Sequence, residues 1–129
     1  MPAYGANCQA TLLRDNQQQP FWNAEAVAAG TLSIAYQIER VNRSFYPWGM
    51  SFEVTFSGNP GAFEIDIMGA NSDLKTNFVQ LGSITNTNNA ISGAYVGRWD
   101  MPINVWPKYV AGYVKTLTNA VTVTLQVTR

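Results

Sequence analysis

The stretch MSFEVTFSGNPGAFEIDIMG, residues 50–69, is the most informative part of this sequence about its fold. On each side of a turn sequence every second residue is apolar, which gives two sets of three: Phe52, Val54 and Phe56, then Phe63, Ile65 and Ile67. A period of two is typical of a β-strand with one face in the core and the other in solvent. The stretch therefore predicts two β-strands joined by the loop SGNPG.

The same alternation continues on both sides of this stretch. It is clear in residues 31–39 and 120–129 and weaker in four further segments, residues 77–84, 91–97, 102–105 and 108–116. Turn sequences such as GANSD, TNTNN and TLTN separate them. Short strands with a turn roughly every 8–12 residues are typical of sandwiches and barrels. We therefore predict an all-β protein, a jelly-roll-like antiparallel β-sandwich of about eight strands.

The first thirty residues differ from the rest, because they show no sustained period. We predict that residues 1–30 form an extended N-terminal arm and residues 31–129 the β-sandwich domain, with a short helix over residues 23–29. The arm is too apolar to be disordered, since it holds Leu12, Leu13, Phe21 and Trp22. We expect it to pack on its own domain or on a neighbour. In the second case, removal of residues 1–22 would leave a folded domain that binds its partner poorly.

Charge is scarce in this chain of 129 residues, which is long enough for one domain with its own core. Charged residues make up 12%, and 8 basic residues balance 8 acidic ones, so the net charge is zero. Typical soluble domains hold roughly 25% charged residues. A chain with so few charges is poorly protected against association. We therefore expect copies of itself or partners to cover its surface, and the lack of a basic surplus argues against nucleic-acid binding.

The sequence holds no histidine and a single cysteine, Cys8. The usual general base, the commonest metal ligand and every Ser–His or Cys–His arrangement are therefore missing, and an internal disulfide is impossible. We expect no enzymatic activity and no cofactor. No apolar run approaches the roughly 18 residues of a membrane span, and no signal peptide is visible, so we expect synthesis in a cytoplasm and no membrane partner.

The register of the predicted hairpin brings acidic side chains together. If residues 57–62 turn the chain back, Phe56 faces Phe63, and Glu53 lies opposite Asp66 on the other face. Two opposed carboxylates repel each other. We therefore expect a nearby Arg or Lys, a bound cation or a basic side chain of another subunit to offset the repulsion.

The carboxylates of this stretch are the one group of side chains that could bind an ion or catalyse a reaction: Glu53, Glu64 and Asp66. The interpretation that we favour is a polar strand face without a ligand. A calcium site with carboxylate ligands and a glycosidase pair are the alternatives. A glycosidase would also need a deep cleft, for which this chain leaves little room.

Aromatic rings are crowded between two prolines in RWDMPINVWPKYVAGYV, residues 98–114. Because proline cannot donate a ladder hydrogen bond, we predict edge strand and loop here. The tryptophan rings could cap the open ends of the core, anchor a subunit interface, or form a platform on which sugar rings stack. The interface interpretation gives the candidate site residues Leu12, Leu13, Phe21, Trp22, Trp99, Trp106, Tyr109 and Tyr113.

The chain resembles small β-sandwich structural proteins of tailed bacteriophages in three stretches. These are SFEVTFSGNPGAFEIDIMGANSDLKTNFVQLGSIT, WPKYVAGYVKTL and AVTVTLQVTR. The pattern also resembles the discoidin type of jelly roll. The resemblance implies a virion protein on the capsid surface, made in the host cytoplasm. Its expected role is capsid decoration (cement), in which it binds the major capsid protein as a homo-oligomer, with a trimer favoured. The alternative is a carbohydrate- or receptor-binding module of a tail or fibre. The resemblance assigns no functional residue.

Overall fold

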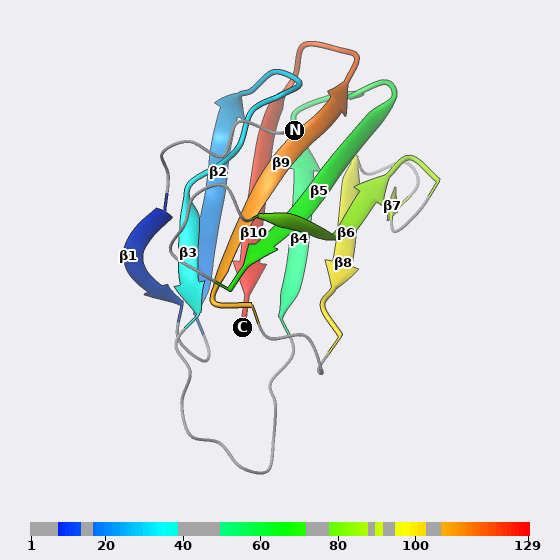
Figure 1. Ribbon diagram of the computed structural model, residues 1–129. Helices are drawn as coiled ribbons and strands as arrows, with labels where there is room; N and C mark the ends of the chain where they lie inside the picture. The colour runs from blue at the N-terminus through cyan, green and yellow to red at the C-terminus, as the bar shows by residue number, and fades with distance from the viewer. Residues whose placement is uncertain are drawn as a thin grey trace.

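A computed structural model describes residues 8–13, 17–38, 50–71, 78–87, 90–91, 95–102 and 107–129 of the chain. Within these residues all regular secondary structure is β-strand (Figure 1). The same residues include no helix that is long and apolar enough to cross a membrane. The all-β prediction is therefore confirmed.

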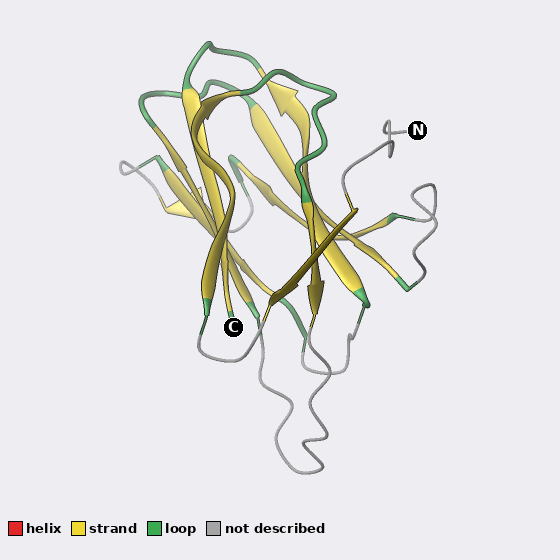
Figure 2. Cartoon of the chain, turned by 90° about the vertical axis from the view of Figure 1, so that its left-hand side faces the viewer, coloured by secondary structure: helices red, strands yellow, loops and turns green. Residues whose placement is uncertain are grey.

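The strands form two sheets of five. The first sheet has the order β1 (Cys8–Leu13), β3 (Ala35–Ile38), β9 (Tyr109–Leu117), β5 (Phe63–Ala70) and β6 (Val79–Thr85). The second sheet has the order β2 (Gln18–Ala26), β10 (Thr122–Thr128), β4 (Ser51–Phe56), β8 (Val96–Asp100) and β7 (Ala90–Ile91). The two sheets face each other as two layers (Figure 2).

The connectivity is that of a jelly roll. Without β1 and the two-residue β7, eight strands remain in the orders β3-β9-β5-β6 and β2-β10-β4-β8, and every pair of neighbours among them is antiparallel. Successive strands pass from one sheet to the other at every step except β5 to β6. Eight strands in two such sheets define the jelly roll. Only β1 departs from this arrangement, because it pairs with β3 in parallel.

The predicted hairpin of residues 50–69 is wrong, because β4 lies in the second sheet and β5 in the first. Phe56 does meet Phe63, with ring centroids 4.6 Å apart, but it does so across the core between the two layers. Alternation places apolar residues on one face whether the two strands pair or face each other. The loop of residues 57–62 crosses between the sheets, and backbone hydrogen bonds from Thr118 and Asn119 to its carbonyl groups hold it there.

The core between the sheets is closed by two tryptophans that pack on glycines of the opposite sheet. Trp22 of β2 and Leu125 of β10 lie against Gly112 of β9, where a Cβ atom would collide with the leucine. On the other side Trp99 of β8 lies on Gly82 of β6, and a Cβ atom there would collide with the indole ring. Glycine is needed at both positions because a side chain of the opposite sheet, Leu125 at Gly112 and Trp99 at Gly82, takes the space of a Cβ atom.

The N-terminal segment belongs to the sandwich. Residues 18–26 form β2, which pairs with β10 over its whole length, and its Phe21 and Trp22 are only 5% and 3% exposed. The Tyr36 hydroxyl of β3 donates a hydrogen bond to the Pro20 carbonyl, 2.6 Å away. The predicted boundary at residue 30 therefore falls after the first strand of the jelly roll. Residues 1–7 and 14–16 of the predicted arm lie outside the described residues.

Two local predictions are wrong because tertiary pairing overrides local pattern. Residues 23–26 of the predicted helix belong to β2, since the edge of β10 supplies backbone partners for them. Residues 98–114 are predicted as edge strand and loop, but β9, which begins at Tyr109, lies inside the first sheet between β3 and β5. Pro107 precedes β9 and Pro102 follows β8, so neither proline interrupts a ladder.

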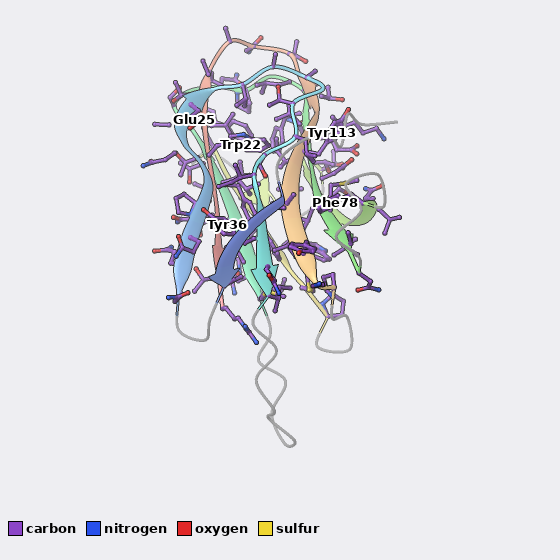
Figure 3. The ribbon with its side chains drawn as sticks, turned by 60° about the vertical axis from the view of Figure 1, so that its left-hand side comes forward. Trp22, Glu25, Tyr36, Phe78 and Tyr113 are labelled. Carbon is purple, nitrogen blue, oxygen red and sulfur yellow. The ribbon has the colours of Figure 1, made fainter. Side chains whose placement is uncertain are left out.

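The position of Trp22 reverses the expectation that residues 1–22 can be removed. Trp22 lies between the sheets, whereas Glu25 of the same strand lies at the surface (Figure 3). We expect Trp22→Ala to lower the free energy of unfolding by about 3–5 kcal/mol, the usual cost of emptying a tryptophan site, and removal of residues 1–22 to prevent folding. Glu25→Ala is the matched control and should change stability by less than about 0.5 kcal/mol. Urea unfolding followed by circular dichroism measures both; a folded truncated chain would contradict this account.

Candidate functional site

The predicted interface residues of the N-terminal segment are core residues of this chain. Leu13, Phe21 and Trp22 belong to the apolar cluster between the sheets, and Leu13 is fully buried. Their apolar character therefore needs no partner subunit to cover it. The side chain of Leu12 and the whole of Trp106 lie outside what the structure describes.

Trp99 occupies the gap between β8 and β6 at one side of the sandwich. It is partly buried, packs on the core and lies 5.8 Å from Phe52, centroid to centroid. This position matches the interpretation in which a tryptophan ring caps the core. Part of the ring remains at the surface.

Tyr109 and Tyr113 lie on the outer face of the first sheet, beside a second apolar cluster. That cluster consists of Ala35, Met68, Ala70, Phe78, Tyr109 and Ala111, with Leu32 and Tyr113 packed against it. Tyr109 is 7% exposed, so it contributes little surface. Tyr113 is half-exposed and lies higher on the sheet than Phe78 (Figure 3). Of these two tyrosines only Tyr113 is available to a ligand.

The predicted group of three carboxylates does not exist, because the sheet assignment separates its members. Glu53 lies on β4 of the second sheet, opposite Arg98 of β8 and Gln126 of β10. Arg98 also forms an ion pair with Asp100, with Nε and Oδ1 2.9 Å apart, and this interaction lowers the pKa of Asp100. The opposed carboxylates of the predicted hairpin are therefore far from each other, on opposite faces of the sandwich.

Glu64 and Asp66 remain together, two positions apart on the outer face of β5. The Lys115 ammonium of β9 lies 3.4 Å from the Glu64 carboxylate. The Gln80 amide of β6 donates a hydrogen bond of 3.3 Å to Asp66 Oδ1. Tyr113 of β9 is the cross-strand partner of Asp66. We call these five residues, Glu64, Asp66, Gln80, Tyr113 and Lys115, the carboxyl cluster.

Asp66 is the unusual member of the carboxyl cluster, because only 5% of the residue is exposed. Burial is the main cause that raises the pKa of Asp66 to about 7; the hydrogen bond and charge of Glu64 contribute to the rise, and the charge of Lys115 opposes it. A carboxyl group whose pKa lies near 7 is present in both its protonated and its ionised form at neutral pH. The carboxyl cluster can therefore offer both a carboxyl donor and a carboxylate acceptor near neutral pH.

The carboxyl cluster lacks the ligands of a metal centre. Nowhere in the part of the chain that the structure describes do three acidic, cysteine or histidine side chains converge in a geometry that could hold a metal ion. A carboxyl pair, an amide, a lysine and a half-exposed tyrosine can instead exchange hydrogen bonds with hydroxyl or amide groups of a ligand.

Sequence reasoning found Glu64, Asp66 and Tyr113 but missed the residues that complete the cluster. Gln80 reaches Asp66 because β6 pairs with β5, and a pairing between separate segments leaves no local signal. Lys115 had a signal, since it alternates in phase with Tyr113 along its strand. The phase alone puts Lys115 on the same side of the strand as Tyr113, and the β5–β9 pairing is what places it near Glu64.

Comparison of the chain with protein-family models, curated proteins and solved structures gives no match. The resemblance to phage structural proteins therefore stays a prediction. Functional inference rests on the fold and on the residues of this chain, and a shared fold does not by itself define a function.

Because the pKa of Asp66 is raised in the folded protein, we expect the free energy of unfolding to depend on pH. Between pH 4 and pH 7 the native state holds a proton that an unfolded aspartate has already released, so the free energy of unfolding falls as pH rises through this range. The charged or titratable groups facing Asp66 are Glu64 on its own strand and Tyr113 and Lys115 on β9, while β6 supplies only Gln80 and Ser83.

Asp66→Asn removes this proton while keeping the shape of the side chain. We expect the variant to be more stable than the wild type at pH 8, by on the order of 2 kcal/mol, and similar to it at pH 4. Thr116→Asn, a neutral change on the same face, is the control and should follow the wild-type pH dependence. Chemical unfolding at several pH values measures the difference, and parallel curves for Asp66→Asn and the wild type would contradict it.

Proposed function

We propose that this protein is a non-enzymatic structural component of a tailed-bacteriophage particle, a capsid decoration (cement) protein that binds the major capsid protein and stabilises the head. The observation that carries the proposal is a jelly roll with few charges: 12% of the residues are charged, and the net charge is zero. Jelly rolls are frequent in viral capsid proteins. A surface with few charges suits a protein that spends its lifetime in contact with other proteins.

The mechanism is cross-linking by many weak contacts. Each contact with the shell removes apolar area from water, with a gain of roughly 25 cal/mol per Å² before the costs of association are subtracted. A symmetric particle repeats the contact, and an oligomer that engages several sites at once gains affinity by avidity. The rigid two-layer sandwich keeps the contacting faces in fixed relation, so little conformational entropy is lost on binding.

The test uses particles of the virus whose genome carries this sequence. We expect purified particles to contain the protein in many copies, and particles made without its gene to bind the added protein until their sites are filled. Particles that already carry the protein are the matched control and should take up little more. Gradient sedimentation followed by mass spectrometry measures the copy number, and absence of the protein from purified particles would overturn the proposal.

A second function, a carbohydrate- or receptor-binding module of a tail or fibre, is favoured by the carboxyl cluster. The half-exposed ring of Tyr113 offers an apolar surface on which the C–H face of a sugar can lie. Beside it the Glu64 carboxylate can accept hydrogen bonds from two hydroxyl groups, and Lys115 can donate one. This arrangement stands on a rigid sheet face.

A glycan array with the purified protein tests this second function. Saturable binding to a sugar that Tyr113→Ala weakens at least about tenfold, or roughly 1.4 kcal/mol, would support it. Thr55→Ala, at an exposed position on the outer face of the second sheet, is the control and should leave binding unchanged. An array without any saturable signal would rule the sugar-binding module out.

A further inference from the structure

The exposed apolar surface of the described residues is concentrated on two side chains. Val79 is 60% exposed and Tyr95 is 44% exposed, and they are the only large hydrophobic side chains in the described part of the chain that are fully at the surface. Val79 begins β6, the end strand of the first sheet, and Tyr95 directly precedes β8 of the second sheet. We call the side of the molecule formed by these two strands the β6–β8 flank.

The two strands contact each other where the sheets meet. Trp99 of β8 lies on Gly82 of β6, and part of its ring remains at the surface. Figure 1 shows β6, β7 and β8 together on one side of the sandwich, away from β1 and β2. Val79 lies beside Gly69 at one end of this flank, Tyr95 lies beside Phe56 at the other end, and the partly exposed Trp99 adds apolar surface between them.

β6 lacks the features that protect most edge strands. Its sequence, VQLGSIT, contains neither a charged residue nor a proline, and its only irregularity is one bulge opposite Ile67 and Met68. β1, the other end strand of the first sheet, is also without charge and proline, but the Arg129 guanidinium donates a hydrogen bond to its Leu13 carbonyl group. The end strand β2 of the second sheet carries Pro20, Glu25 and two register shifts. An uncharged edge without proline is a template for pairing with another strand, whereas charge, proline and bulges discourage pairing.

We propose that two copies of this chain associate through the β6–β8 flank, with β6 of one copy pairing antiparallel to β6 of the other across a twofold axis. A twofold contact needs a surface that is complementary to itself. An uncharged strand meets that need, because identical strands without charges do not repel one another. The first sheets of the two copies then form one continuous sheet, and the partner copy covers Val79 and Tyr95.

The twofold contact goes beyond the proposed function, because it forms whether or not the protein binds a particle. It also differs from the trimer that the phage resemblance favours, since an antiparallel pair of identical edges closes after two copies. The chain carries no net charge, so there is no overall repulsion between copies. The pairing is therefore a property of the isolated protein in solution.

Sedimentation of the purified full chain over a range of concentrations tests the inference. We expect the wild type to be a dimer, and Val79→Lys to raise the dissociation constant at least about tenfold by placing two charges at the strand pair. Thr55→Lys, which adds the same charge to an exposed position on the outer face of the second sheet, should dimerise like the wild type. Both substitutions are at exposed positions, and equal unfolding curves confirm that each variant is folded.

A monomeric wild type at high micromolar concentration would overturn the inference. So would a trimer, or a dimer that Val79→Lys leaves as tight as before. These results are independent of particle binding: a monomer that decorates particles refutes only the β6 pairing, and a dimer absent from particles refutes only the decoration role.

Discussion

The packing of Trp22 and Leu125 against Gly112 is the interaction on which the rest of the sandwich depends. It joins a side chain from the N-terminal segment and one from β10 to the central strand of the opposite sheet. If a side chain stood at Gly112, the sheets could not approach at this point, and the indole would lose the surface that covers it. Phe21 and Tyr36 extend the same contact, with ring centroids 5.3 Å apart. The segment that looks least regular in sequence thus completes the core.

The sequence predicts the strands well and their arrangement only in part. Alternation at Phe52, Val54 and Phe56 places these side chains in the core, and they are buried. The same alternation could not tell a hairpin from two strands in facing layers, because both put the apolar set on one side. Residues 23–26 were predicted as helix because small residues favour it locally, and the free edge of β10 made them a strand. The carboxyl cluster was found in part, since Lys115 and Gln80 arrive through strand pairings between distant segments.

In the part of the chain that the structure describes, two ion pairs lie on the outer faces of the sandwich. Glu64 lies near Lys115 on the first sheet, and Arg98 lies near Asp100 on the second. β6 is left without charge at the edge between them. A net charge of zero says nothing about such an arrangement, since the same total could come from charges scattered over every edge. Within the described residues, β6 is an uncharged edge beside strands that carry ion pairs.

The pairing of β2 with β10 has a consequence for synthesis on the ribosome. The neighbours β2 and β10 are separated by about a hundred residues, as the hydrogen bond from the Ala24 amide to the Thr124 hydroxyl shows. Contacts between segments so distant in the chain slow folding, because the chain between them loses conformational entropy on loop closure before the contact can stabilise it. Trp22 is translated about a hundred residues before Leu125 and has no Leu125 to pack on until β10 has been made. Until then the nascent chain carries an uncovered aromatic segment, and transiently exposed apolar surface of this kind promotes aggregation.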